Sequence, residues 1–432
     1  MATPCWATRP DIMNDFLDML GAPPDDALAA VRSAGRARFA ESGFPTRRTE
    51  AWRFTELRKL TETRFGPASA GIAGMPAIDE IADADRLVFI NGCFVADRSR
   101  IGTLPKGVFL GSFADWARAH ADEAAASFDL AGGADRAFLS LNAAFATDGL
   151  ALIVPAGVKL DRRIQVIHIA SAVEPAASHL KHLVRLGDGA EAVLVESFTG
   201  SGPHWTNASA TVELGDDAKL GHYKLQNEAA EATHIAHHAV TIGARGHYDG
   251  FLLTLGAGLS RQDMRATIAG PDAFCGFSGA YLLAGRQDAT MASVILHAAP
   301  NGRTHEVFKG CLADRAHGVF QGQIRVAQAA QKTDAYQLNK TLLLSDRAVM
   351  DSKPELEIFA DDVKCSHGAT IGDLDETALF YLRSRGIEAE QARRMLIEAF
   401  VVDAVDLISD EVVRNHFIAA IGHWLAARKE PA

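Results

Sequence analysis

Between about residues 150 and 372, the chain alternates short apolar runs with turn-forming residues, a pattern that predicts a long series of β-strands. Turns of similar composition begin at Leu186, Leu214, Ile242 and Ile268, which are 28, 28 and 26 residues apart. A period in the twenties is typical of a solenoid, because each unit can bury its apolar face only against the next. We therefore expect a mainly β protein with a parallel β-helix core. A β-sandwich is the alternative that this pattern leaves open.

Helical patterns flank the strand region on both sides. The predicted organisation is an N-terminal helical domain with a linker over residues 1–85, a β-helix core over 86–372 and a C-terminal helical domain over 373–432. A helical insertion interrupts the core near residues 111–149, and the linker is the Gly-, Ala- and Pro-rich stretch 67–80. Because the ends of a solenoid expose unpaired strand edges, we expect the flanking helices to cap these ends.

The start of the C-terminal helical domain has a clear signal. Asp373 is a favourable N-cap residue, and Glu376 three positions later completes a capping box. The helices that follow have wide apolar stripes, which we expect to pack on each other and to leave a face for another protein.

Composition narrows the classes of function. Of the 432 residues, 48% are hydrophobic and 22% are charged, as is usual for a globular protein. The formal net charge of −11 argues against nucleic acid or an anionic membrane as the main partner. We find no secretory signal and no apolar run long enough to cross a membrane. The five cysteines are far apart and form no C-x-x-C pair, so we expect a reducing compartment, the cytoplasm.

A candidate ligand pair lies where the strand region ends. Cys365 and His367 are two residues apart, so an extended backbone would project both side chains to the same side. A thiol and an imidazole would then offer one soft and one borderline ligand to a metal. The alternative is that Cys365 is a small buried hydrophobic residue and His367 a hydrogen-bonded turn residue, and two ligands alone are a weak metal signature.

A second cluster, His234, His237 and His238, could also hold a metal, since His234 and His238 would share a face. No cysteine or second carboxylate belongs to the local pattern, so solvated histidines are the favoured interpretation. The sequence contains no phosphate-binding loop of the G-x-x-x-x-G-K-[ST] type and no G-x-G-x-x-G after a strand. The residues alone therefore reveal no reaction.

Four segments resemble a known family. They are Glu50–Thr55, Lys332–Lys340, the block Ala360–Gly372 that contains Lys-Cys-Ser-His-Gly-Ala-Thr, and Tyr381–Ile387. Together they are similar to the SufB/SufD family of iron–sulfur cluster assembly proteins. The N-terminal Trp-containing segment and the Cys/His block point to the SufD branch, and the SufB branch is the nearest alternative.

This resemblance implies a right-handed parallel β-helix between helical domains. It further implies that the chain pairs with SufB through the β-helix and binds the ATPase SufC through its C-terminal helices. His367 would contribute a ligand to a transient iron–sulfur cluster shared with SufB, with Cys365 as a weaker candidate. The chain would thus be a scaffold rather than an enzyme and would hold no stable cofactor alone. Arg393, Arg394, Leu396 and Phe400 are plausible SufC contacts, and a homodimer of the isolated chain stays open.

Two functions from other classes compete with the scaffold. Many β-helix proteins act on polysaccharides, but such enzymes need a groove with clustered carboxylates and stacked aromatic residues. The five Trp and five Tyr residues here are scattered along the chain. The other alternative is a self-sufficient metalloprotein that uses His234, His238 and His222.

Overall fold

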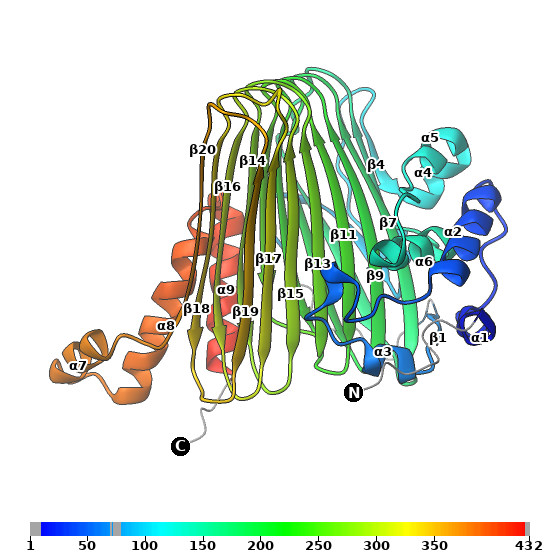
Figure 1. Cartoon of the computed structure of the whole chain (residues 1–432). Coiled ribbons are helices and arrows are strands. Elements are labelled where there is room, and N and C mark those ends of the chain that lie inside the picture. The colour runs from blue at the N-terminus through cyan, green and yellow to red at the C-terminus, as the bar shows by residue number, and fades with distance from the viewer. Residues whose placement is uncertain (1–9, 70, 72–78, 428–432) are drawn as a thin grey trace.

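The computed structural model describes residues 10–69, 71 and 79–427. Within these residues the core consists of two ten-stranded sheets, whose strands lie side by side in a long stack (Figure 1). From β6 to β20 the chain alternates between the two sheets, so each coil adds one strand to each. Neighbouring coils pair in parallel, and Lys219 pairs with Glu191 on one side and His247 on the other. The prediction of a parallel β-solenoid is confirmed.

The strands and helices have the following bounds. Sheet A contains β4 (Phe109–Ser112), β5 (Leu150–Val154), β7 (Ala176–Leu186), β9 (His204–Leu214), β11 (Thr233–Ile242), β13 (Leu259–Ile268), β15 (Asp288–His297), β17 (His317–Val326) and β19 (Val349–Ile358), with β1 (Gly66–Pro67) beside β7. Sheet B contains β2 (Ala84–Ile90), β3 (Cys93–Phe94), β6 (Arg163–Ser171), β8 (Glu191–Ser201), β10 (Lys219–Glu228), β12 (His247–Thr254), β14 (Phe274–Leu283), β16 (Arg303–Leu312), β18 (Asp334–Leu343) and β20 (Lys364–Gly372). The helices are α1 (Pro10–Met19), α2 (Ala29–Ser42), η1 (Glu50–Trp52), α3 (Arg58–Glu62), η2 (Ala96–Arg98), α4 (Phe113–Ala119), α5 (Ala121–Ala126), η3 (Ala134–Arg136), α6 (Ala137–Phe145), α7 (Glu376–Ser384), α8 (Ala389–Val405) and α9 (Glu411–Ala426).

The repeated turns of the sequence form one corner of the coil. Gly189, Asp217 and Arg245 occupy equivalent positions with φ between 56° and 66°, the left-handed region that a tight corner requires. Aspartate side chains connect successive corners: Asp188 Oδ1 accepts a hydrogen bond from the backbone N–H of Asp216 at 2.9 Å, and Asp216 Oδ1 accepts one from that of Ala244 at 2.8 Å. The Gly-Asp pattern therefore recurs because it bends the chain and ties each coil to the next.

In-register apolar columns fill the lumen between the sheets. Leu152, Val184, Val212 and Val240 follow one another on successive strands of sheet A, and all are buried. Burial at about 25 cal/mol per Å² makes such columns the main source of stability. No coil could bury its own column without a neighbour.

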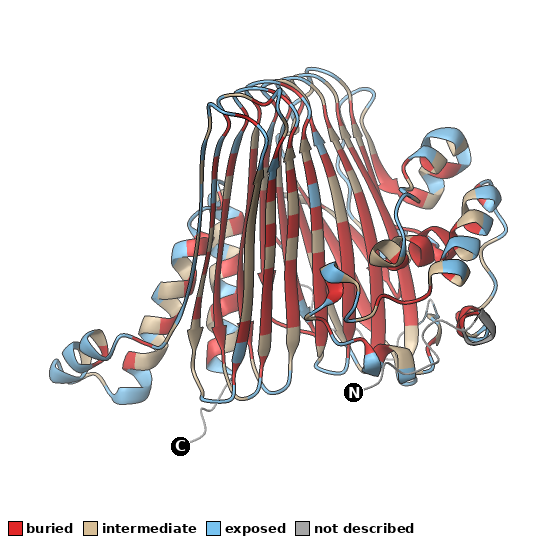
Figure 2. Cartoon of the chain, viewed as in Figure 1, coloured by how far each residue is buried: buried red, intermediate tan, exposed pale blue. Residues whose placement is uncertain are grey.

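Helices pack on part of the outer face of each sheet, and Figure 2 marks the buried residues of the chain in red. On sheet B, α8 and α9 pack over the middle strands, and Phe417 of α9 lies with its ring centroid 6.0 Å from that of Phe251. On sheet A, α6 and the N-terminal helices pack around Trp205, and Trp52 stacks on Phe138 at 5.0 Å. The expectation that the flanking helices cap the solenoid ends is wrong, because their apolar stripes pack against sheet faces.

The two ends of the stack differ. At the first end, the short strands β3 and β4 pair antiparallel with β2 and β5 and close the sheets. At the other end, β19 pairs with β17 and β20 with β18, and no described strand pairs with their outer edges. Helix α7 begins soon afterwards, capped by Asp375, whose Oδ1 accepts from the N–H of Thr377 at 2.8 Å, so the predicted cap at Asp373 is two residues early.

An ion-pair bridge fastens the last strand of sheet A to the stack. His317 of β17 contacts Asp288 of β15 through Nδ1 at 3.0 Å and Asp351 of β19 through Nε2 at 2.9 Å. Hydrogen bonding to Asp288 and then to Asp351 raises the pKa of His317 to about 9.

The raised pKa of His317 predicts a pH dependence of folding stability. An unfolded histidine titrates near pH 6.5, so the stabilisation is fully present below about 6.5 and is lost as the pH rises through about 9. The shift corresponds to at most ~3 kcal/mol, since one pKa unit is worth about 1.4 kcal/mol. His317→Gln should remove this dependence in urea unfolding measured between about pH 6 and 9.5. His305→Gln is a control, because His305 stacks on Tyr336 instead. If the free energy of unfolding changed equally with pH in wild type and His317→Gln, the prediction would be contradicted.

Candidate functional site

The predicted ligand pair lies on β20, the last strand at the open end. Cys365 pairs in register with Ala335 of β18, and His367 pairs with Gln337. Ala335 and Gln337 are buried in the lumen, and in-register neighbours of a parallel sheet place their side chains on the same face. Cys365 and His367 therefore face the lumen side together, as their spacing predicts.

The two side chains differ in how readily they could bind a metal. His367 is exposed, whereas Cys365 is half-buried and packs with Ala335 and Leu356. Burial raises the pKa of the Cys365 thiol, and the nearby carboxylate of Asp334 acts in the same direction. Since the thiolate is the metal-binding form, Cys365 must first lose a proton that it holds tightly. His367 is thus the more accessible of the two candidate ligands.

Large apolar side chains are exposed around this end. The exposed fractions are 51% for Val349, 59% for Phe359 and 44% for Ile371. They flank the outer edges of β19 and β20, which carry backbone donors and acceptors without a described partner strand. Native proteins usually protect such edges, so an exposed apolar edge indicates a surface that another chain covers.

A buried polar column lies directly behind His367. Gln337 Nε2 donates to Glu306 Oε2 at 2.7 Å, and Ser293 Oγ donates to Glu306 Oε1 at 2.5 Å. Gln337 and Glu306 are in register, and neither is accessible to solvent. Burial raises the pKa of Glu306 to about 7, and the bonds from Ser293 and Gln337 limit the shift.

The histidine cluster on β11 does not form a metal site. His234 is fully buried, with Nδ1 2.8 Å from Glu228 Oε2 and Nε2 2.9 Å from Lys224 Nζ. His237 is also buried and lies on the opposite face, 3.4 Å from Asp263. In the described part of the chain, no three His, Cys, Asp or Glu side chains come together as a metal would require. The expectation of solvated histidines is wrong, because His234 faces the packed lumen and helices cover the outer face on which His237 lies.

The residues predicted to contact a partner lie on α8. Leu396 and Phe400 are half-buried and pack against the sheet B cluster, and Lys309 Nζ lies 4.9 Å from the Phe400 ring centroid. Arg394 pairs with Glu390 at 3.1 Å, and Arg393 is half-buried. These positions stay predictions, and two of them contribute to the fold.

The most exposed apolar side chains of the C-terminal helices lie elsewhere. Phe380 and Tyr381 on α7 are 73% and 58% exposed, and Met395 on α8 is 42% exposed. Helix α7 projects away from the sheets in Figure 1. The sequence predicts that the C-terminal stripes leave a face uncovered, but periodicity alone does not show that this face includes Phe380.

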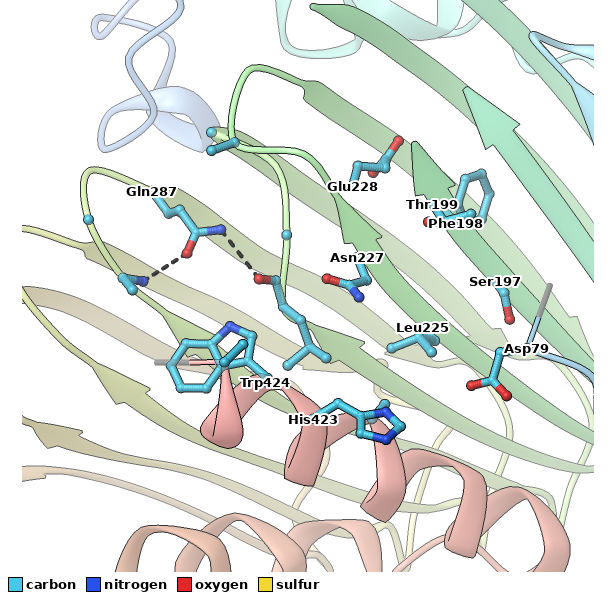
Figure 3. A pocket seen from close by; sticks show the side chains of 18 of the residues that line it. Asp79, Ser197, Phe198, Thr199, Leu225, Asn227, Glu228, Gln287, His423 and Trp424 are labelled. Atoms are coloured by element: carbon cyan, nitrogen blue, oxygen red, sulfur yellow. Dashed lines mark hydrogen bonds between the residues drawn. The ribbon is translucent and has the colours of Figure 1, made fainter. Parts of the chain in front are cut away.

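A cleft of about 1120 Å³ lies between α9 and the outer face of sheet B. Figure 3 shows Trp424 and His423 of α9 facing Leu225 and Asn227 of β10 across it. Gln287 closes one side, where its Nε2 donates to the Ala257 carbonyl at 3.0 Å. None of the residues predicted from the sequence as ligands lines this cleft, and its mixed lining does not define a reaction.

Comparisons with known proteins identify the family of this chain. A family model described as "SUF system FeS cluster assembly, SufBD core domain" matches residues 168–400, and "SufBD protein N-terminal region" matches residues 11–166. The chain belongs to the SufBD family.

Relatives from three organisms cover nearly the whole SufBD chain. A SufBD family iron–sulfur cluster assembly protein of Synechocystis is 32% identical over 90% of this chain and 89% of its own. The chloroplastic protein ABCI7 of Arabidopsis thaliana is 31% identical over 92% and 86%. The iron–sulfur cluster assembly protein SufD of Escherichia coli is 29% identical over 89% and 90%. The resemblance inferred from sequence blocks is confirmed.

Two further findings bear on this SufBD chain. No helix among the described residues is long and apolar enough to cross a membrane. Cys93, Cys275, Cys311 and Cys365 are free thiols, while Cys5 lies outside the described residues.

Sequence reasoning missed Gln337 and Glu306, which lie in ordinary strand positions. When both faces of a strand are covered, the alternation of its residues does not show which positions face the lumen. Glu306 and Gln337 can therefore be recognised as buried lumen residues only once the register is known.

The raised pKa of Glu306 predicts that Glu306→Gln stabilises the protein at alkaline pH. The proton that the folded state holds stabilises it below the unfolded pKa near 4.5, and this contribution is lost as the pH rises through about 7. Glutamine avoids the buried charge and can still accept from Gln337, so we expect a gain of at most ~3 kcal/mol near pH 8 that vanishes near pH 5. Urea unfolding measures the gain, with the exposed Glu231→Gln as the control. If Glu306→Gln lowered the free energy of unfolding equally at pH 5 and pH 8, this expectation would be contradicted.

Proposed function

We propose that this chain is a SufD-type subunit of an iron–sulfur cluster assembly scaffold and donates His367 to a nascent cluster at an interface with SufB. The observation that carries the proposal is the unpaired end of the solenoid, with His367 on its last strand. The similarity to SufD of Escherichia coli supports the SufD branch over the SufB branch. In this proposal the iron–sulfur cluster is the cargo of the assembly, and the chain is a scaffold rather than an enzyme.

The open end has the properties of a heterodimer surface. A partner strand could add to β20, which contains no proline, while Pro354 removes a backbone donor from β19. The exposed Phe359 and Ile371 would supply apolar contacts next to this strand. In the absence of SufB, the same edge could pair with a second copy of the chain. A homodimer of the isolated chain therefore stays open.

A ligand at the rim suits a cluster that must leave. Iron in clusters is usually held by thiolates, and histidine can replace some of them. A single exposed imidazole with a weaker thiol beside it provides only part of a ligand set, so SufB would have to supply the remainder. Any movement that separates the two chains would then change the ligand set. Nucleotide binding by SufC would supply such a movement by favouring one arrangement of the complex.

The C-terminal helices are the proposed docking site for SufC. Phe380, Tyr381 and Met395 give α7 and the start of α8 an exposed apolar surface. Arg383 and Arg385 on the same projecting segment are also exposed. Aromatic and arginine side chains are those that dominate interface energetics. We place the complex in the cytoplasm, since free and well-separated thiols fit a reducing compartment.

The polysaccharide-enzyme alternative has little support. Helices pack over the middle strands of sheet B and over the N-terminal half of sheet A. These are the faces on which a groove with clustered carboxylates would have to form.

Replacing His367 should separate cluster assembly from folding. Because the side chain is exposed, His367→Ala should change the free energy of unfolding by less than about 0.5 kcal/mol. We expect the complex with SufB and SufC to form normally and to give far less cluster in anaerobic absorption spectra. Cys365→Ala should have a smaller effect, and Ser366→Ala, on the opposite face of β20, none. Full cluster yield with His367→Ala would exclude His367 from the site.

Replacing the exposed aromatic residues of α7 should weaken SufC binding. We expect Phe380→Ala with Tyr381→Ala to lower the affinity at least tenfold, about 1.4 kcal/mol, without loss of stability. Leu396→Ala is the matched comparison, since replacing a half-buried residue should lower the thermal stability more than the affinity for SufC. Calorimetric titration with SufC and thermal unfolding measure the two effects. Unchanged affinity of the double variant would place the SufC surface elsewhere.

A further inference from the structure

A buried oxygen next to His367 has no hydrogen-bond partner. Gln337 is inaccessible to solvent, and its Nε2 is committed to Glu306 at 2.7 Å. Its Oε1 has no hydrogen-bond partner among the described residues. An unsatisfied buried acceptor costs about 1–3 kcal/mol, so it calls for an explanation.

The orientation of the Gln337 amide is fixed from behind. When Glu306 is ionised it can only accept, from Gln337 Nε2 and from Ser293 Oγ, so a reversed amide would place two oxygens against each other. Gly322 leaves the space in which this amide fits, because a Cβ at that position would lie 2.2 Å from Gln337 Nε2. The amide therefore keeps its nitrogen toward Glu306 and its oxygen free for another donor.

His367 is the neighbour of Gln337 on the strand that ends the stack. The two residues are in register on β20 and β18, and their side chains share the lumen face. We propose that Gln337 is a positioning residue whose Oε1 accepts a hydrogen bond from one ring N–H of His367, so that the other ring nitrogen is presented to iron at the open end. Only the presentation of the ring nitrogen to iron rests on the proposed function, since the hydrogen bond itself can be tested without iron.

The proposed contact would let the polar column behind His367 select which ring nitrogen of His367 carries the proton. The ring nitrogen that carries the proton is set by the hydrogen bond it makes, and the other nitrogen keeps its lone pair for a metal. Partners that hold a metal-binding histidine in this way typically change metal affinity by about 10- to 100-fold when they are removed. Glu306 and Ser293 orient the amide, Gln337 orients the imidazole, and only the imidazole would touch the cluster.

The test uses the full-length chain without metal, labelled with ¹⁵N-histidine. The His367 signals are identified by their loss in His367→Gln, and their ring ¹⁵N shifts at neutral pH report which nitrogen carries the proton. In wild type we expect two well-separated shifts that indicate one tautomer. Gln337→Met, which keeps the volume and removes the amide, should bring the shifts toward the average of two exchanging tautomers. Gly322→Ala, which displaces the amide but retains Gln337, should do the same.

Asn339→Leu is the matched control. Asn339 is a second buried amide on the lumen face of β18, but its register neighbour on β20 is Ala369. This variant should leave the His367 shifts unchanged. Identical His367 shifts in wild type and Gln337→Met would overturn the proposal.

The role of Gln337 toward iron is tested on the complex with SufB and SufC. We expect Gln337→Met to weaken Fe²⁺ binding at least tenfold while complex formation is retained. Unchanged Fe²⁺ binding, together with altered His367 shifts, would overturn the role toward iron but not the hydrogen bond. Normal cluster assembly with His367→Ala would instead overturn the proposed function, and the nuclear magnetic resonance result would still decide whether Gln337 holds His367.

Discussion

Backbone hydrogen bonding between successive coils is the constraint on which this structure depends. Each strand between β5 and β18 has its N–H and C=O groups paired with a coil on either side, which also stacks the apolar columns of the lumen. Such a stack must end, and the last coil at each end leaves unpaired groups. Antiparallel strands close the first end, whereas β19 and β20 leave the other end open. The two ends of the stack therefore differ, and only the end at β19 and β20 leaves strand edges that no described strand pairs with.

The middle of the lumen satisfies a different requirement. Lys224, Glu228 and His234 are buried together and are bonded or paired to one another. Replacing one member of such a buried group would leave an uncompensated charge, so the group fixes how the facing strands align even where it adds little net stability. The polar column at Glu306 lies nearer the open end, where Oε1 of Gln337 has no hydrogen-bond partner and His367 is its in-register neighbour.

The sequence predicted the solenoid because its corners are chemically similar. Gly189, Asp217 and Arg245 recur at constant spacing with left-handed backbones, and Asp188 and Asp216 connect the successive corners. It could not predict where the helices pack. An amphipathic stripe shows that a face is buried but not against what, so the helices were assigned to the ends when they cover the sheets. The same covering explains His237, which lies on an outward-facing position and is nevertheless buried.

The candidate ligand pair shows what a local pattern can predict and what it cannot. The spacing of Cys365 and His367 correctly placed them on one face, because alternation is a local property of a strand. Their position at a free edge depends on the stack ending at β20, which no local pattern encodes. The role proposed for Gln337 depends on both, since its amide nitrogen is bonded within the core and its in-register neighbour lies on the last strand. A site of this kind is visible from neither the family blocks nor the strand pattern alone, and it follows once register and burial are considered together.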